Sequence, residues 1–286
     1  MSPPNNSSIG DINQSVTRKF LEHKMGVFGV CCLVIIGGLC FLAPFFTHHT
    51  YDQQNLAIAG EGPSAEHWLG TDILGRDLFA RILYGGRISF LVGISATFVS
   101  LTIGVTYGAI SGWAGGRIDR LLMRIVEIIY SLPYTVFVIL LMVFLGRGLF
   151  PLLCAIGAVE WLTMSRIVRG QVLNLRQQSF VEASQILGQK PLKIIWKHMI
   201  PNAMTPIIIC ITLTIPNVML MESFISFLGL GIQAPMTSWG DLIKEGANAM
   251  QTQPWLLIFP SLFFSITLFS LNYIGDALRS ALDPHS

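Results

Sequence analysis

The sequence contains few charged residues, and this scarcity excludes most classes of protein. Only 12% of its 286 residues are charged, while 52% are hydrophobic, whereas a typical soluble domain carries about 25% charged residues. So little polar surface cannot cover a soluble globule. The high apolar content also excludes a disordered chain, and five cysteines are too few for a disulfide scaffold. The composition therefore indicates an integral membrane protein.

The sequence also lacks the motifs of common membrane enzymes and nucleotide-binding proteins. It contains neither H-E-x-x-H nor G-x-S-x-G, and Tyr273 stands where the G-x-G-D motif of intramembrane aspartyl proteases needs a glycine. No Gly-Lys dipeptide occurs, which rules out a G-x-x-x-x-G-K-[ST] phosphate loop. We therefore predict no catalytic residue and no cofactor, and any ATP that drives this protein must be bound by another chain.

Patterns for binding metals or nucleic acids are missing as well. The five cysteines all lie in apolar runs and form no C-x-x-C pair, so we interpret them as lipid-facing or core thiols. His48 and His49 are adjacent, but no third ligand is near them in the sequence, and we interpret them as residues of the membrane interface. We expect no metal site, and the net charge of +2 is too small for a nucleic-acid partner.

Six apolar runs are candidates for membrane spans, each of which needs about 20 helical residues. They are residues 25–46, 88–113, 125–145, 149–164, 204–230 and 255–274. The third run is interrupted at Ser131-Leu132-Pro133, and the fourth is short and contains Pro151 and Glu160. The sequence therefore predicts an all-α integral membrane protein with six transmembrane helices.

The basic residues predict the orientation of these spans. With the N-terminus inside, 13 of the 18 basic residues lie in cytoplasmic segments, as the positive-inside rule expects of short loops. Without the fourth span, the basic loop at 166–202 would lie outside, so we retain that span. This predicts two cytoplasmic termini and the following parts: an N-terminal tail (1–24), a first transmembrane helix (25–46), a periplasmic segment (47–87), a five-helix core (88–280) that contains the cytoplasmic loop (166–202), and a C-terminal tail (281–286).

The end of the periplasmic segment has a helical pattern of its own. Leu78, Ile82 and Leu83 recur at helical spacing, with Arg81 on the opposite side. This pattern favours an interfacial helix that leads into the second span. An irregular loop is the alternative.

The cytoplasmic loop predicts two short helices with a glycine between them. A first apolar stripe ends at Gly188, a residue that adopts the left-handed conformation at helix ends. Pro191 suits the first turn of a second helix, and Pro201 is expected to end that helix. Its apolar stripe has the spacing i, i+3, i+4, i+7 and i+8, and consists of Leu192, Ile195, Trp196, Met199 and Ile200.

Charged residues inside the predicted spans need an explanation, since one at the bilayer centre costs about 2.5–3.5 kcal/mol. Arg124 and Glu127 are three residues apart and are expected to pair. Glu160 is expected to reach the cytoplasmic interface. Glu222 lies about 27 Å along the fifth span, towards the outer side, where it either lines a path or pairs with an arginine of the outer segment.

The cytoplasmic loop carries a known motif. Glu182-Ala183-Ser184, followed by Gly188 and by His198-Met199-Ile200-Pro201, resembles the EAA loop of ABC-importer permeases. The family usually has alanine at the position of Ser184, and isoleucine and leucine at the positions of His198 and Ile200. The histidine version followed by Pro-Asn is similar to the motif of peptide permeases.

Other segments narrow the resemblance to one branch of this family. The stretch 67–77 resembles the signature before the second span in the C-type permease of dipeptide and oligopeptide importers, and its signature residues are Gly70, Thr71, Asp72, Gly75, Arg76 and Asp77. The stretch 222–240 and the ending Gly275-Asp276-Ala277-Leu278-Arg279 are similar to the same subunit. The resemblance covers about residues 66–284.

The resemblance implies a type I ABC-importer permease fold in the bacterial inner membrane. It implies a permease subunit that forms half of the translocation path of an ATP-driven peptide importer. Its partners would be a second homologous permease, two cytoplasmic ATPase subunits, and a periplasmic or lipid-anchored peptide-binding protein. Two alternatives stay open: the dipeptide, nickel or another small-solute branch of the family, and a membrane assembly protein that transports nothing.

The resemblance also assigns roles to particular residues. The second short helix of the loop would be a coupling helix that docks in a groove of an ATPase. The coupling residues would be Glu182, Ala183, Ser184, Gly188, Leu192, Ile195, Trp196 and Pro201. Candidates for the path or its gate are Glu222, Phe224 and Phe227.

Overall fold

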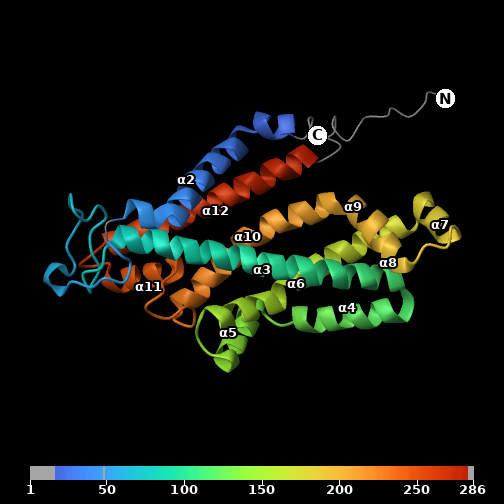
Figure 1. The fold of residues 1–286 in the computed structure, drawn as a ribbon. Helices are drawn as coiled ribbons and strands as arrows, with labels where there is room; N and C mark the ends of the chain where they lie inside the picture. Colours follow the sequence, from blue (N-terminus) through green and yellow to red (C-terminus); the bar gives the residue numbers. More distant parts are fainter. Residues whose placement is uncertain (1–16, 48, 283–286) are drawn as a thin grey trace.

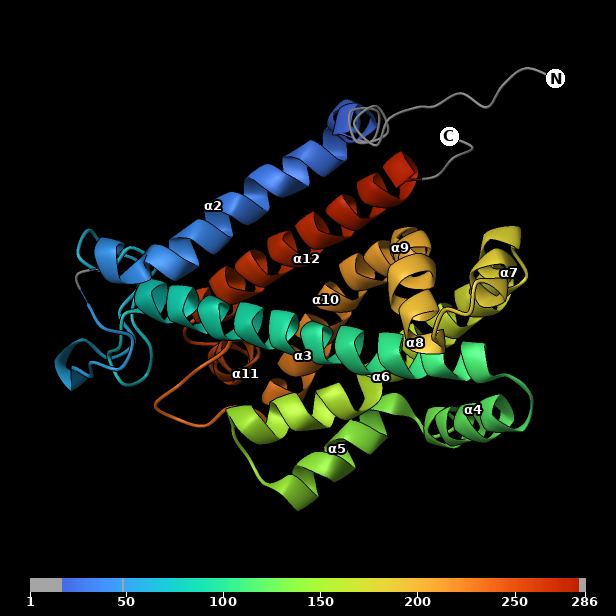
Figure 2. The same ribbon diagram turned by 45° about the vertical axis from the view of Figure 1, so that its right-hand side comes forward.

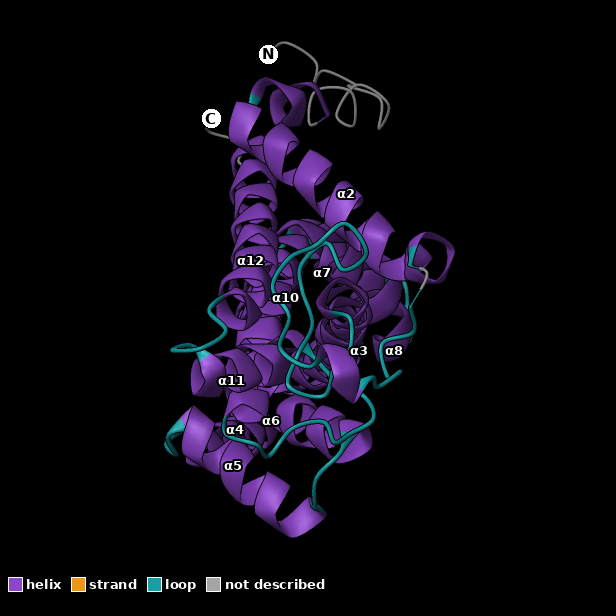
Figure 3. Ribbon diagram, turned by 90° about the vertical axis from the view of Figure 1, so that its left-hand side faces the viewer, coloured by secondary structure: helices purple, strands orange, loops and turns teal. Residues whose placement is uncertain are grey.

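The computed structural model describes residues 17–47 and 49–282, which form helices joined by loops (Figures 1 and 3). Within these residues, five helices are long and apolar enough to cross a membrane: α2 (Lys24–Phe46), α3 (Leu78–Ala114), α6 (Leu149–Arg176), α10 (Met204–Phe227) and α12 (Trp255–Leu282). Helices α4 (Gly116–Tyr130) and α5 (Tyr134–Leu145) supply a sixth crossing if they are one span bent by 85°. The predicted all-α membrane fold is confirmed.

The bend between α4 and α5 lies at the predicted interruption. Helix α4 ends at Tyr130, and α5 begins directly after Pro133, whose φ is −57°. Proline lacks a backbone N–H and disfavours the helical conformation in the residue before it, here Leu132. The proline therefore separates two helices that would otherwise be continuous.

Helix α3 corrects the prediction of an interfacial helix before the second span. It begins at Leu78, where the Asp77 side chain accepts a hydrogen bond of 2.7 Å from the Ala80 N–H, and continues for 37 residues, which is about 55 Å. The side chains expected at the interface are buried: Ile82 and Leu83 are 0% exposed, and Arg81 is 3% exposed. This part of α3 is buried on both its apolar and its polar side, because other parts of the chain cover both.

Helices α3 and α6 lie side by side through the middle of the molecule (Figures 1 and 2). Three glycines of α3, at four-residue spacing, face α6: Gly104, Gly108 and Gly112. A Cβ atom on Gly108 would lie 2.4 Å from the Ser165 carbonyl oxygen. Small residues at this spacing let two membrane helices approach closely, so the three glycines set the distance between α3 and α6.

The two ends of the bundle carry different structures. We call the end with residues 49–77 the predicted outer end; it also holds the short helices η1 (Leu56–Ile58) and α11 (Trp239–Ala249) and lies on the left in Figure 1. We call the opposite end the predicted inner end. It holds α7 (Ser179–Ile186), α8 (Pro191–Ile194), the π-helical turn Ile195–Met199 and α9 (Ile200–Asn202). Helices α2 and α12 pack together along one side (Figure 2).

Candidate functional site

At the predicted inner end, Gly188 separates two short helices, as predicted. Its φ is +73°, the left-handed conformation that glycine adopts at little cost. The Gly188 N–H donates to the Gln185 carbonyl at 2.9 Å, and the Gln189 N–H donates to the Ser184 carbonyl at 3.2 Å. This pair of bonds is the Schellman motif that ends a helix and reverses the chain.

The second helical segment ends at Asn202, one residue after the predicted end at Pro201. The chain passes from α8 through the π-helical turn into α9 and reaches α10 after Ala203. Pro201 lies in the first turn of α9, where its missing N–H removes no hydrogen bond. The wider π turn, with the Ile200 N–H bonded to the Ile195 carbonyl, brings the chain to this proline without a break.

The apolar stripe of the second helix is divided between two surroundings. Ile195 and Met199 are buried in a core formed with Val105 of α3 and Val168 of α6. In contrast, Leu192 is 66% exposed and Trp196 is 51% exposed. The helix therefore uses one half of its stripe to pack against its own protein.

Apolar residues at the end of α7 are exposed as well. Ile186 is 86% exposed and Leu187 is 77% exposed. We call Ile186, Leu187, Leu192 and Trp196 the inner apolar patch. Glu182 and Ala183 of α7 are exposed as well, whereas Ser184 is buried and donates a hydrogen bond of 2.8 Å to the Phe180 carbonyl. Large apolar side chains that stay exposed on a loop indicate a surface for a partner.

At the predicted outer end, two of the signature residues, Asp72 and Arg76, belong to a largely buried network of charged side chains. The Asp72 carboxylate accepts hydrogen bonds of 2.6 Å from Arg76 Nε and from Arg81 Nη1. Arg81 also contacts Glu245 of α11 through two hydrogen bonds of 2.5 and 3.0 Å. We call these four residues the outer ion cluster. It ties the loop 49–77 to α3 and to α11.

The other signature residues shape the loop that holds the cluster. The Thr71 hydroxyl donates to the Ile58 carbonyl at 2.5 Å, and Asp77 caps α3. Gly70 and Gly75 have positive φ values of +86° and +67°, and a Cβ on Gly75 would lie 1.8 Å from the Asn55 carbonyl oxygen. These residues therefore build the closed outer end of the fold.

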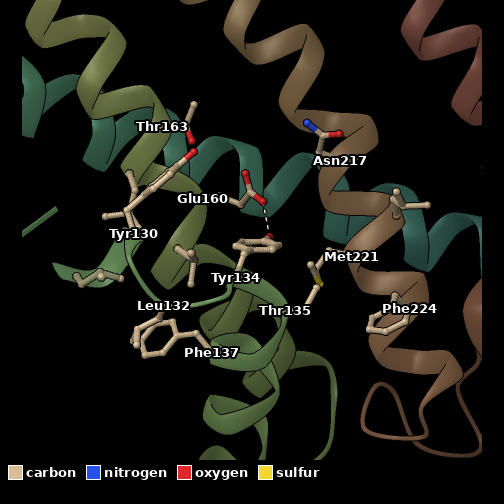
Figure 4. A pocket seen from close by; sticks show the side chains of 14 residues that line it. Tyr130, Leu132, Tyr134, Thr135, Phe137, Glu160, Thr163, Asn217, Met221 and Phe224 are labelled. Atoms are coloured by element: carbon tan, nitrogen blue, oxygen red, sulfur yellow. Dashed lines mark hydrogen bonds between the residues drawn. The ribbon is translucent and has the colours of Figure 1, made fainter. Parts of the chain in front are cut away.

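A cavity of about 770 Å³ lies between α4, α5, α6 and α10 (Figure 4). Its lining is mainly apolar and includes the polar side chains of Thr135, Glu160, Thr163 and Asn217. The Tyr134 hydroxyl donates a hydrogen bond to the Glu160 carboxylate, which points into the cavity from α6. Glu160 thus lies in the middle of α6 and faces the cavity, not the inner interface where the sequence analysis expected it.

The three candidate path residues have separate positions. Phe224 lines the cavity. Phe227 does not line it and is partly exposed. Glu222 is fully buried, and its carboxylate accepts hydrogen bonds of 2.9 Å from Ser89 and from Ser226. Among the described residues its partners are hydroxyls, so the structure does not support one of the two predicted alternatives, a pair with an outer arginine.

Another ion pair, near the predicted inner end, escaped the sequence analysis. Arg169 of α6 donates two hydrogen bonds of 2.6 Å to the Asp119 carboxylate of α4, and the Ser111 hydroxyl of α3 donates to the same carboxylate at 2.6 Å. The pair joins three helices. The predicted pair Arg124–Glu127 is present at 3.8 Å, but both side chains are exposed.

Comparisons with known proteins agree with this geometry. Residues 104–286 match the family described as the inner membrane component of binding-protein-dependent transport systems, and residues 13–63 match the N-terminal transmembrane domain of oligopeptide transport permease C. The chain is 46% identical to the oligopeptide transport system permease protein OppC of Bacillus subtilis, over 93% of this chain and 87% of that protein. It is 47% identical to OppC of Haemophilus influenzae, over 95% of this chain and 88% of that protein.

A dipeptide permease and a solved transporter are similar as well. The dipeptide transport system permease protein DppC of Bacillus subtilis is 44% identical, over 95% of this chain and 85% of that protein. A chain in an inward-facing structure of the MetNI methionine ABC transporter matches with a TM-score of 0.59 and 16% identity, over 71% of this chain and 96% of that chain. This last match confirms the predicted ABC-importer permease fold. The chain belongs to the family of inner membrane components of binding-protein-dependent transport systems.

Proposed function

We propose that this chain is a permease subunit of an ATP-driven oligopeptide importer in the bacterial inner membrane. Relatives named as oligopeptide permeases align with it over nearly its whole length, and this similarity supports the substrate class. The inner apolar patch is the observation that carries the mechanism, because it leaves four large apolar side chains uncovered at the position of the EAA-like motif.

The patch is the proposed docking surface for a cytoplasmic ATPase. An amphipathic helix that lies in a groove of its partner is a common mode of recognition, and Trp196 and Leu192 are the side chains free to enter such a groove. Glu182 and Ala183 of α7 are exposed as well. The buried half of the stripe, Ile195 and Met199, connects a movement of the docked helix to α3 and α6.

The cavity is the proposed half of the translocation path. A second, homologous permease would complete it, and a peptide-binding protein would deliver the substrate at the outer end. The cavity combines apolar walls with polar groups, such as the Asn217 amide and the Glu160 carboxylate, and a peptide backbone bound there needs both. ATP hydrolysis by the separate ATPase chains would open this path alternately to each side of the membrane.

The experiment compares two substitutions at Gly188. Nothing lies within 4 Å of a Cβ at this position, so any effect comes from the left-handed backbone. That conformation costs an ordinary residue about 1–2 kcal/mol, but asparagine adopts it more readily. Gly188→Val should therefore turn α8 away from its groove, whereas Gly188→Asn should largely preserve it.

The measurement is uptake of a labelled oligopeptide by cells with matched membrane levels of each variant, together with co-purification of the ATPases. We expect Gly188→Val and Glu182→Ala to reduce both, and Gly188→Asn to resemble the wild type. Normal uptake with Gly188→Val and Glu182→Ala would contradict coupling through this loop. Competition by dipeptides or nickel ions, but not by oligopeptides, would assign the chain to another branch of the family.

A further inference from the structure

Three metal-ligating side chains from distant parts of the sequence meet at the predicted outer end. His49 follows the end of α2, while Glu66 and His67 precede α3. One ligand atom from each side chain lies within 4.8 Å of the other two, and the imidazole rings of the two histidines have centroids 4.7 Å apart. No third ligand lies near His49 in the sequence, but the fold brings Glu66 and His67 to it.

The buried histidine of this group already has the orienting contact of a metal ligand. His67 Nδ1 lies 2.9 Å from the Asp77 carboxylate, and both side chains are 7% exposed. Asp77 is itself held in place, since it caps α3 through the Ala80 N–H. When His67 donates its Nδ1 proton to Asp77, Nε2 keeps a lone pair for a metal. Histidine ligands in metal sites commonly donate their second N–H to a carboxylate in this way.

Space and access at the cluster also fit an ion. A cavity of about 420 Å³ lies beside the cluster; His49, Glu66 and Asp77 line it, whereas His67 does not. Glu66 is exposed, so its side chain can move towards an ion. Bonds of about 2.0–2.1 Å to zinc in tetrahedral geometry place the ligand atoms about 3.3 Å apart. Since ligand atoms of the three side chains lie within 4.8 Å of one another, they have to approach each other by up to about 1.5 Å to bind one ion.

We propose that His49, Glu66 and His67 bind one divalent transition-metal ion, with Asp77 as the positioning residue of His67. Two imidazoles and one carboxylate form a ligand set of the kind zinc accepts, with water in the fourth position. The bound ion would join the outer end of α2 to the segment that leads into α3. This site is separate from the cavity and from the inner apolar patch, so it does not depend on the proposed transport function.

The test uses the full-length chain in lipid nanodiscs, purified with a tag that contains no histidine. Zinc is added to the chelator-treated protein, free ions are removed, and bound zinc is counted by elemental analysis. Cobalt(II) absorption then reports the ligand geometry. We expect about one ion per chain in the wild type and loss of that ion in His49→Ala and Glu66→Gln. His198→Ala, at the opposite end of the molecule, is the matched histidine control and should keep the ion.

Asp77→Asn separates the proposed site from general damage to the fold. Asparagine still caps a helix, but it removes the negative charge that orients His67 and should weaken zinc binding by about 10–100-fold. Zinc should raise the Tm of the wild type and of His198→Ala, but not that of Glu66→Gln, while these three proteins should share one Tm in chelator. Zinc binding that is absent from the wild type, or unchanged in His49→Ala and Glu66→Gln, would overturn the proposal.

Discussion

Replacing Gly108 by alanine tests the close contact between α3 and α6. The new Cβ would lie 2.4 Å from the Ser165 carbonyl oxygen and 3.0 Å from the Arg169 backbone nitrogen. Ordinary contacts begin at 3.4 Å, so the two backbones must separate by about 1 Å, and overpacking of this kind costs about 1–3 kcal/mol. We expect a fall in Tm of about 2–4 °C for each kcal/mol lost.

Gly170→Ala is the matched control because it adds the same methyl group to the partner helix. Nothing lies within 4 Å of a Cβ at Gly170, and alanine has a helix propensity about 1 kcal/mol better than glycine. This variant should therefore keep or raise the Tm of the full-length chain, measured by intrinsic fluorescence in nanodiscs. A Tm for Gly108→Ala equal to or above that of Gly170→Ala would refute the reasoning.

Three further predictions concern charged and exposed residues. Burial, with Glu222 and Glu245 nearby, raises the pKa of Asp241 from 3.8 to about 7. The folded state therefore keeps a proton that the unfolded chain releases, and the stability present below about pH 4 is lost as the pH rises to 7. Asp241→Asn should raise Tm more at pH 8 than at pH 5 in thermal scans. Asp119→Asn should cost about 1–3 kcal/mol in the same scans, because Arg169 loses its charged partner. Trp196→Ala should lower Tm only modestly, since the side chain is 51% exposed, yet weaken ATPase binding by about 2 kcal/mol or more in a titration.

The features predicted correctly from the sequence depend on neighbouring residues. The break before α5 depends on Pro133 alone, and the left-handed turn after α7 depends on Gly188. The membrane helices follow from the lengths of their apolar runs. Each of these signals acts through backbone conformation or through the local density of apolar side chains. A short stretch of sequence is therefore enough to predict each of these features.

The features that were missed depend on residues far apart in the chain. Arg81 is buried because Glu245 reaches it from 164 positions away, and Asp119 meets Arg169 from 50 positions away. Helical spacing is the same for a buried and for an interfacial helix, so the pattern at 78–83 could not distinguish them. The glycines at 104, 108 and 112 were a readable signal of close packing, because small residues at four-residue spacing mark a contact face.

The uninterrupted length of α3 has a mechanical consequence. Arg81 in the outer ion cluster and Ser111, which contacts the Asp119–Arg169 pair, lie on this one helix, about 45 Å apart. Helix α3 contains no proline, whereas α10 and α12 contain Pro216 and Pro260. A rigid rod of this length that tilts by 5° about one end moves its other end by about 4 Å. If α3 tilts as a rigid body, a small rotation at one face of the membrane therefore displaces the helix at the other face by more than the width of a water molecule.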